Sequence, residues 1–535
     1  GGGGGDAAAV VEQAIADLKE NFDPEYGGFG GAPKFPSPHT LIFLLRVYQA
    51  DGDPDLLAMA EKTLRAMHAG GIYDHVGLGF HRYAMDASWL VPHFEKMLYD
   101  QALLAVAYTE AFGVTGDPFY RKVAMEVLAY MDRNLKGTEG AFYSAEDAES
   151  GGREGGFYLW TWDEVKGILG GTEFAAFAGT YGICREGNIP RRGKKPDDTE
   201  NVLHLAMTGE KLAGDLGILP SELDEVLASA MEKVRAAREK RVKPARDEKI
   251  LTDWNGLAIA AFAIAARIFD SGEYLATARG ATDFILSTLA REDGRLLHRY
   301  RSGDAAVEGN ADDYTFLAWG LIELYRAGFD TRYLDRAATL TDLLIDHFRD
   351  RDRGGLFFTP DDGEPLIARL KPVHDGATPS ANSVALHNLL LLSHLTGRTR
   401  YLDFARELEA WYLGEHAGSA AASSWMMAAL KGGLHPPIDV VVVGDPEAAG
   451  TRALLAAISS RGLLDAAVVV KPASGDALLD ALAPFTKSFT MKSGKAAAYV
   501  CRNHSCELPV TDPEALGAIL DQALPKRPDG VWRPG

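Results

Sequence analysis

Apolar residues recur every three to four positions over most of this 535-residue chain, a spacing typical of amphipathic helices. A short polar turn of similar sequence separates successive helices, and its copies begin at Asp51, Thr115, Asp270, Phe329 and Thr396. Four copies lead into a stretch rich in glycine and aromatic residues, at 70–80, 140–143, 294–300 and 354–358. One helix pair cannot bury its own apolar face, so such repeats stack on one another.

The helical spacing covers 7–21, 38–50, 55–68, 93–113, 118–135, 222–240, 253–269, 274–290, 313–327, 332–348, 380–395, 400–415 and 422–431. Strand patterns are almost absent before residue 438. We therefore expect residues 7–436 to form a mainly α (α/α) toroid of six or seven helix hairpins. The polar stretch 181–203 interrupts the rhythm, and its length indicates a solvated insertion, which we favour, or a functional lid.

After residue 436 short β-branched runs alternate with helical patterns. We expect strands at 439–444, 466–470 and 496–501, and helices at about 446–461, 475–483 and 512–523. This alternation predicts a small parallel α/β domain over 437–535. Residues 1–6 begin with five glycines and indicate a linker or the remnant of a preceding domain.

Charge and cysteine content narrow the class of protein. A formal net charge of −20 argues against a nucleic-acid partner, which requires a basic face. No apolar run reaches the ~20 residues that a membrane helix needs, and the N-terminus lacks the features of a signal peptide. Three cysteines, Cys184, Cys501 and Cys506, make a disulfide framework improbable and favour a reducing compartment, the cytoplasm.

The densest group of chemistry-bearing side chains lies between residues 74 and 101. A helix beginning near Pro92 would place His93 and Asp100 on one side and Glu95 on a neighbouring face. Buried polar groups without partners are costly, and the number of them here favours a functional site over capping roles. The residues of this segment expected to bind substrate are His75, His81, Arg82, Tyr83 and Trp89.

Polar groups also mark the starts of later helices. Each acid taken alone is explained as an N-cap, but the accompanying Trp and Asn side chains are not. Helix starts at one end of a toroid converge, so these groups would line one sugar-sized cleft. They are Glu146, Asp147, Asp253, Trp254, Asn255, Asp312, Asp313, His374 and Asn382.

Metal and cofactor binding are less favoured. His75, His81, His93 and Glu95 do not have the spacing of a metal-ligand motif, and phosphate-binding, dinucleotide-binding and nucleophile-elbow motifs are absent. The 501–506 segment could hold a soft metal or a redox pair, although its cysteines are farther apart than in the common motif. We therefore expect neither a metal nor a cofactor.

Long and specific motifs occur at 27–36, 70–83, 89–102, 142–149, 251–256 and 501–506. Through them the chain resembles the spermatogenesis-associated, thioredoxin-domain-containing proteins over essentially its whole length. The resemblance implies a six-hairpin toroid like those of glycosidases and N-acylglucosamine 2-epimerases, preceded by a thioredoxin-like domain. We expect that domain to be absent from this chain, which puts a redox function in doubt.

The favoured function is a sugar epimerase or isomerase with its site in the toroid lumen. His93 and His374 are the candidate acid and base, because an imidazole exchanges protons near neutral pH. Glu95, Asp100 and Asp253 would orient them or bind sugar hydroxyls. The expected partner is a small-molecule substrate, a sugar.

Two alternatives stay open. A glycoside hydrolase would use paired carboxylates, with Asp253, Asp312 or Asp313, and Glu146 as candidates. A non-catalytic module would bind a glycan or peptide for a thioredoxin-like partner domain. Ligand binding without turnover would favour the second alternative.

Overall fold

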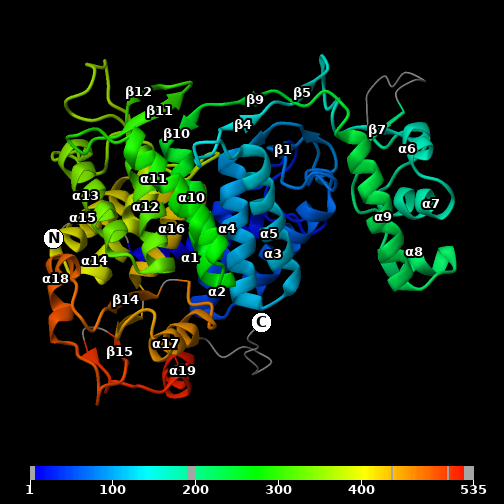
Figure 1. Cartoon of the computed structure of the whole chain (residues 1–535). Helices are drawn as coiled ribbons and strands as arrows, with labels where there is room; N and C mark the ends of the chain where they lie inside the picture. The colour runs from blue at the N-terminus through cyan, green and yellow to red at the C-terminus, as the bar shows by residue number, and fades with distance from the viewer. Residues whose placement is uncertain (1–5, 190–198, 435–437, 465, 503–504, 523–535) are drawn as a thin grey trace.

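The computed structural model describes residues 6–189, 199–434, 438–464, 466–502 and 505–522. The glycines of the expected linker, the expected boundary at 436, the middle of the 181–203 stretch and the last thirteen residues lie outside the described residues. Helices account for most of the rest, with a small sheet below them (Figure 1).

Among the described residues six helices form an inner ring, in which each packs on the next and the last packs on the first. Their order around the ring follows the chain. They are α2 (Pro38–Asp51), α4 (Leu98–Thr115), α10 (Thr252–Phe269), α12 (Ala311–Gly328), α14 (Ala381–Thr396) and α16 (Ser424–Leu434).

An outer helix packs on each inner helix of the described chain. Five outer helices follow their inner partners directly, whereas the first helix of the chain packs on α16 and so closes the ring. The fold is therefore an (α/α)6 toroid, and the expected choice between six and seven hairpins is settled at six. The outer helices are α3 (Pro54–Ala69), α5 (Pro118–Tyr130), α11 (Gly272–Thr288), α13 (Thr331–Phe348), α15 (Thr399–Glu415) and α1 (Ala7–Asn21).

The repeated polar turns start the outer helices by a common mechanism. Asp53 and Asp117 accept hydrogen bonds from backbone N–H groups two residues later, and Pro54 and Pro118 occupy the first helical position. A capping carboxylate satisfies a backbone N–H that has no partner inside the helix. The polar turns of the repeat therefore supply the N-caps of these outer helices.

The predicted helix over 93–113 begins five residues later, at Leu98. Residues 92–97 instead form β2 (Pro92–His93) and β3 (Lys96–Met97), which pair with β1 (Tyr83–Ala84) and β4 (Ala145–Glu146). These backbone pairings hold the segment extended. His93 and Asp100 therefore do not share a helix face, and that prediction is wrong.

An insertion of helices between β6 (Arg153–Glu154) and β9 (Arg246–Asp247) projects from one side of the toroid (Figure 1). Only its last helix was predicted, because the first three span seven, ten and eight residues and show too little periodicity. The insertion contains β7 (Trp160–Thr161), α6 (Trp162–Ile168), α7 (Gly171–Thr180), β8 (Glu200–Asn201), α8 (Gly209–Leu216) and α9 (Pro220–Arg238).

The C-terminal sheet is mixed, not parallel as predicted. β13 (Asp439–Val443) pairs in parallel with β14 (Ala467–Lys471) and antiparallel with β15 (Ala497–Arg502), which turns into β16 (Ser505–Cys506). The short return at the β15–β16 turn makes the last pairing antiparallel, since a parallel pair needs a long crossover. The helices of this unit are α17 (Ala449–Ser459), α18 (Ala477–Leu482) and α19 (Pro513–Asp521).

Alternate residues of β13 face two different cores. Val441 and Val443 join the large apolar core of the toroid. Val440 and Val442 pack in a smaller core with Leu454 of α17 and with α19. A strand with both faces buried reads as a continuous apolar run, which explains why this strand was easy to predict.

The C-terminal unit closes the toroid at the carboxyl ends of the inner helices. Arg326 of α12 donates to the carbonyls of Leu464 and Ala466. Gln49 of α2 donates to the carbonyl of Gly462. The amino ends of the inner helices lie at the opposite end of the ring. Within the described part of the chain, each helix falls short of the length or apolar character required to cross a membrane.

Candidate active site

Direct contacts join α4 to α10, α10 to α12, and α16 both to α2 and to the loop before α14, and we call this end of the ring the rim. The contacts link successive helices of the ring. They are Tyr99 with Trp254 (ring centroids 4.8 Å apart), Asp253 N with Asp313 Oδ1 (3.0 Å), Asp375 Oδ2 with Trp425 N (2.7 Å), and Thr40 Oγ1 with Ser424 Oγ (3.0 Å).

Amide side chains brace this rim. Asn255 accepts a hydrogen bond from the N–H of Phe142 and donates to its carbonyl, and Asn382 makes the same pair of bonds with Leu356. Gln101 repeats the arrangement with the glycine-rich stretch of its own hairpin. Fully buried amides with these bonds satisfied hold the repeats together, so Asn255 and Asn382 are structural residues rather than ligands of a substrate.

A cavity of about 440 Å³ opens at the rim, between α2, α4 and the loop before α14. This volume lies near the lower end of the ~300–1,000 Å³ of small-molecule sites. Its lining combines apolar side chains with charged and other polar ones. The lining residues are Leu18, Phe29, Phe35, Pro36, Ser37, Pro38, His39, Thr40, Arg82, Tyr99, Asp100, Asp375, Gly376, Ala377, Ala421 and Ala422.

Asp100 is the carboxyl of the cavity that is most available to a ligand. It is 5% exposed, and its Oδ2 has no hydrogen-bond partner among the described residues. Burial raises the pKa of Asp100 well above 3.8, against the opposing charge of Arg82. Burial therefore favours the protonated carboxyl of Asp100, which can donate a hydrogen bond to a neutral ligand.

Asp375, the second carboxyl of the cavity, was not selected from the sequence. Its oxygens accept hydrogen bonds from the N–H groups of Trp425 and Ser380. Burial raises its pKa to about 6 despite these bonds. The neighbouring His374 was selected, yet its ring is exposed and lies 2.9 Å from Ser419 Oγ. His374 is not among the residues that line the cavity.

A second group of titratable side chains lies beside the cavity, around His298. This residue was missed because it stands alone in a strand, β11 (Leu297–Arg301), which forms a hairpin with β12 (Asp304–Glu308). Its Nδ1 lies 3.0 Å from Asp313 Oδ1. Burial alone would lower the pKa of His298, but Asp313 and Asp253 raise it to about 9.

The acids around His298 differ in how they are bonded. Asp313 is fully buried and also accepts hydrogen bonds from the backbone N–H groups of Asn310 and Asp253. Burial and the charge of Asp313 raise the pKa of Asp253 well above its usual range. The same two causes raise the pKa of Asp312 to about 7. Asp312 Oδ1 is buried with no hydrogen-bond partner in the described chain.

A ring contact connects the His298 group to the lining of the cavity. Trp254, next to Asp253, packs edge-on against Tyr99, which lines the cavity. The backbone of Ala381, at the start of α14, hydrogen-bonds Asp312. Four carboxyls with raised pKa values therefore lie at or beside the amino ends of the inner helices. Perturbed carboxyls gathered at one concave face are a feature of catalytic sites.

His75 and His81 have structural roles instead of the predicted substrate contacts. His75 Nε2 lies 3.2 Å from the carbonyl of Gly70, and His81 Nδ1 lies 3.0 Å from the carbonyl of Phe94. Burial lowers the pKa of His75 to about 4 and, with the charge of Lys96, that of His81 to about 3. Both rings are neutral at neutral pH and bonded to the backbone.

A buried ion-pair network joins the insertion to the toroid. Asp74 contacts Lys96 Nζ at 2.7 Å and Arg238 Nη1, from α9, at 2.7 Å. Burial would raise the pKa of Asp74, but these two cations hold it well below 3.8. The network places a charge pair under the loop 74–81 and explains part of the polar density noted in the sequence.

Arg82, Tyr83, His93 and Glu95 do lie together. Arg82 donates to Glu95 Oε2 at 3.0 Å, and His93 Nδ1 lies 3.4 Å from the same oxygen. The ring of Tyr83 stacks on that of His93 with centroids 5.1 Å apart. Of these four, Arg82 lines the cavity.

Three other selected residues are engaged elsewhere. Trp89 is fully buried and its Nε1 donates to the carbonyl of Tyr26, so its ring is not available to a ligand. Glu146 accepts hydrogen bonds from Tyr130 and Asn134. Asp147 is exposed and caps its own turn through the N–H of Glu149.

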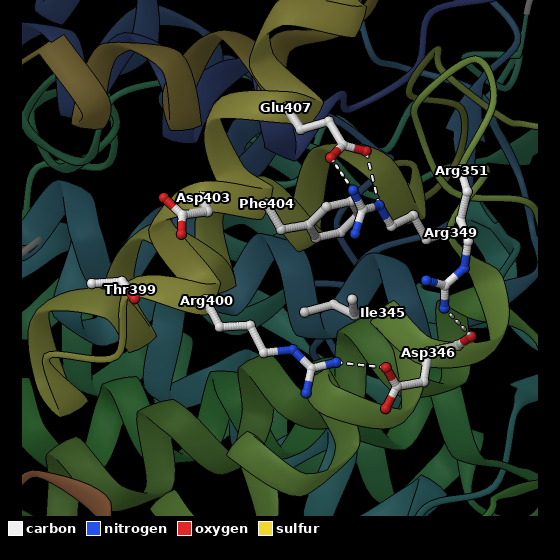
Figure 2. Close-up of a pocket in the computed structure, with 9 residues that line it drawn as sticks. All are labelled: Ile345, Asp346, Arg349, Arg351, Thr399, Arg400, Asp403, Phe404 and Glu407. Carbon is white, nitrogen blue, oxygen red and sulfur yellow. Dashed lines mark hydrogen bonds and ion pairs between the residues drawn. The ribbon is translucent and has the colours of Figure 1, made fainter.

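A groove of about 410 Å³ on the outside of the toroid, between α13 and α15, is occupied by ion pairs. Arg349 binds Glu407, and Arg400 binds Asp346 (Figure 2). These carboxylates neutralise the guanidinium groups, so the two arginines are poorly available to bind a ligand in the groove.

Cys501 and Cys506 are joined by a disulfide between the paired strands β15 and β16. The sequence made a disulfide framework improbable and allowed a redox pair or a soft-metal site at these cysteines. The covalent pairing occupies both sulfurs in this structure. The two residues in the centre of the segment lie outside the described chain.

Comparison with known proteins identifies relatives along nearly the whole chain. The chain is 36% identical over 546 residues to spermatogenesis-associated protein 20 of Homo sapiens, covering 96% of this chain and 69% of the human protein. The chain belongs to the spermatogenesis-associated protein 20 family. A family member from Rattus norvegicus is 36% identical with the same coverage. The search against protein-family models gave no match.

The fold of this family member is shared with solved structures. The crystal structure of D-mannose isomerase aligns with a TM-score of 0.51 at 13% identity, covering 80% of this chain and 97% of that chain. At this identity the likeness shows the toroidal fold alone. The resemblance and the fold class expected from the sequence are both confirmed.

Proposed function

We propose that this chain is a carbohydrate-active enzyme that moves a proton between adjacent carbons of a ring-opened reducing sugar, as an epimerase or isomerase does. The observation that carries the proposal is that Asp312 and His298 both lie next to Asp313, and that the charge of each shifts the pKa of the other. The pKa of Asp312 is raised to about 7 and that of His298 to about 9. Near neutral pH the two groups are therefore a base and an acid with matched strengths.

Their roles follow from these protonation states. The Asp312 carboxylate removes the proton from the carbon next to the sugar carbonyl, and the His298 imidazolium gives its proton to the carbonyl oxygen. For isomerisation, the Asp312 carboxyl gives its proton to the neighbouring carbon while the now neutral His298 takes the proton of the adjacent hydroxyl, which becomes the new carbonyl. For epimerisation, the enediol turns so that the opposite face of the same carbon meets Asp312, and His298 takes back the proton from the original carbonyl oxygen. Asp313 holds the His298 ring by its Nδ1 and stabilises the cationic form.

The cavity supplies contacts for the hydroxyl groups. The carboxyl of Asp100, in which burial favours the protonated form, can donate a hydrogen bond, and the guanidinium of Arg82 and the hydroxyl of Tyr99 provide further donors. Burial raises the pKa of Tyr99, so its phenol keeps its proton. A polyol suits this set of groups, because its hydroxyls accept hydrogen bonds from all three.

The alternatives are less well supported by the geometry. A hydrolase needs an ionised carboxylate facing the substrate beside a protonated acid, but the oxygens of Asp313 already accept hydrogen bonds from His298 and two backbone N–H groups. The pair of His93 and His374 is also less favoured, because the ring of His93 stacks on Tyr83 whereas that of His374 is exposed beside Ser419, so the two rings have separate surroundings. A binding role without turnover remains an outcome of the test below.

The test is incubation of the purified chain with reducing sugars in heavy water, followed by NMR and mass spectrometry. We expect deuterium on carbon 2 and conversion to the isomer. Asp312→Asn and His298→Gln should each lower the rate at least about 100-fold. The matched control is His347→Gln, because His347 forms the same Nδ1 contact with an aspartate, 3.0 Å from Asp361, on the outside of the toroid.

Three outcomes separate the candidate functions. Carbon-bound deuterium that both site variants abolish and the control retains supports the proposal. Sugar binding without carbon-bound deuterium, for every sugar tried, contradicts it and favours a binding module. Release of a reducing end from glycosides with no deuterium on carbon contradicts it in favour of hydrolysis.

A further inference from the structure

Three extended segments beside the cavity form a small antiparallel arrangement with two different faces. Lys34 pairs with Ala84 through two backbone hydrogen bonds of 2.8 and 2.9 Å, and Ala84 is opposite Pro92 in the β1–β2 pair. These three residues are buried. Because side chains alternate along a strand, the next residue of each segment points to the other face.

That other face carries three rings in register: Phe35, Tyr83 and His93. Tyr83 is opposite His93 in the β1–β2 pair. The rings of Tyr83 and His93 are nearly parallel, with 7° between their planes, and the ring of Phe35 lies 4.9 Å from Tyr83 at 31°. We call these residues the ring ladder. Cross-strand aromatic pairs of this kind fix the orientation of each ring.

The two ends of the ladder differ. His93, at one end, is held by Glu95, which also binds Arg82 of the cavity. Phe35, at the other end, is 50% exposed and lines the cavity. Single exposed apolar residues are common on protein surfaces. Phe35 differs because the stacked rings of Tyr83 and His93 lie behind it and because it lines a cavity that also has polar groups.

We infer that Phe35 is a stacking platform for the second ring of a disaccharide-sized substrate. This inference rests on the proposed function and specifies its substrate class. Asp312 and His298 are not among the residues that line the cavity, whereas Phe35 is, so a sugar ring on Phe35 would be a second ring, separate from the one that reacts. The apolar C–H face of a pyranose fits an aromatic platform, and Arg82 and Asp100 in the same lining can bind its hydroxyls.

Tyr83 and His93 are then positioning residues. A platform whose rings are already ordered loses little conformational entropy when a ligand binds. This assigns to His93 a role that its sequence context did not suggest. It supports the ring that contacts substrate without contacting substrate itself.

The experiment measures dissociation constants by isothermal titration calorimetry for glucose and mannose and for their α- and β-linked disaccharides. The variants are Phe35→Ala, Phe35→Trp and the control Phe485→Ala, which removes another part-exposed phenylalanine from the C-terminal unit. We expect at least one disaccharide to bind more tightly than its monosaccharide. Phe35→Ala should weaken that disaccharide roughly three- to tenfold and leave the monosaccharide within about twofold.

Phe35→Trp should restore disaccharide affinity, and Phe485→Ala should change neither ligand. Equal affinity for mono- and disaccharides would overturn the inference while leaving the proposed function in place. Equal weakening of both ligands by Phe35→Ala would do the same. Failure of every sugar to bind, together with absence of deuterium exchange, would overturn the proposed function and the inference with it.

Discussion

Replacing Asp312 by asparagine should stabilise the protein at neutral and alkaline pH while abolishing its activity. An unfolded aspartate loses its proton near pH 3.8, whereas the folded protein holds this proton up to about pH 7. Between these values the folded state binds more protons than the unfolded state, so the free energy of unfolding falls as the pH rises. Below pH 3.8 both states are protonated and the penalty is absent.

The loss of unfolding free energy can be calculated from the difference between the pKa values of Asp312 in the unfolded and folded states. A difference between 3.8 and about 7 corresponds to about 4 kcal/mol. Asp312 is only half-buried by surface area, so water screens part of this energy and a gain of about 2 kcal/mol is more realistic. Asparagine has nearly the same shape, keeps an oxygen to accept the hydrogen bond from Ala381 and carries no charge.

The assay compares thermal unfolding of wild type and Asp312→Asn at several pH values from 4 to 8. The advantage of the variant should be near zero at pH 4, grow steadily to pH 7 and then level off. The control is Asp361→Asn, an exposed aspartate beside a histidine, for which we expect a change within about 0.5 kcal/mol. A variant that is equally or less stable than wild type at pH 8 would refute the argument that burial keeps Asp312 protonated.

Three further predictions test the site and the scaffold. The turnover rate should rise with pH through about 7, because Asp312 ionises there, and fall through about 9, because His298 loses its proton. A flat pH profile of the rate over pH 6–10 would contradict the assigned roles. Arg238→Ala leaves Asp74 with one cation instead of two. The variant should lose about 3 kcal/mol of unfolding free energy, and the amides of α9 should exchange hydrogen faster. Unchanged hydrogen exchange in α9 would show that the Asp74–Arg238 pair does not hold the insertion. Gly256→Ala places a methyl carbon 2.4 Å from a backbone carbon of α12. Such overpacking costs about 1–3 kcal/mol, so the melting temperature should fall markedly. An unchanged melting temperature would contradict the close contact between α10 and α12.

Helical periodicity predicted the toroid because it is a local property repeated many times. The inner helices are apolar on nearly every side, and α10 is buried along most of its length. The predicted helix start at Pro92 failed for a reason that no local pattern reveals. Residues 92–97 pair with 83–84 and with 145–146, and the second partner is about fifty residues away. Such long-range pairing overrides local propensity.

The candidate site was predicted less well than the fold. His75 and His81 were selected because polar side chains are dense in their segment of the sequence. Their rings bond backbone carbonyls instead, and this bonding depends on the geometry of the loop. His298 escaped selection because it acquires its role only when the hairpin brings it to Asp313, fifteen residues along the chain. The signal available was a single histidine in an alternating strand immediately before an acidic helix start. Asp253, Asp312 and Asp313 were correctly grouped, since helix starts converge in a toroid.

The position of the acids at helix starts resolves an apparent conflict in their electrostatics. The amino end of a helix favours a negative charge by about 0.3–1 kcal/mol, which by itself would lower the pKa of Asp100, Asp253 and Asp312. Burial raises all three instead, and for Asp312 the net change corresponds to several times the dipole energy. Capping a helix alone gives no reason for ionisation to be this unfavourable. The proposed function accounts for it, because a proton-transfer reaction requires acids that hold their protons near neutral pH.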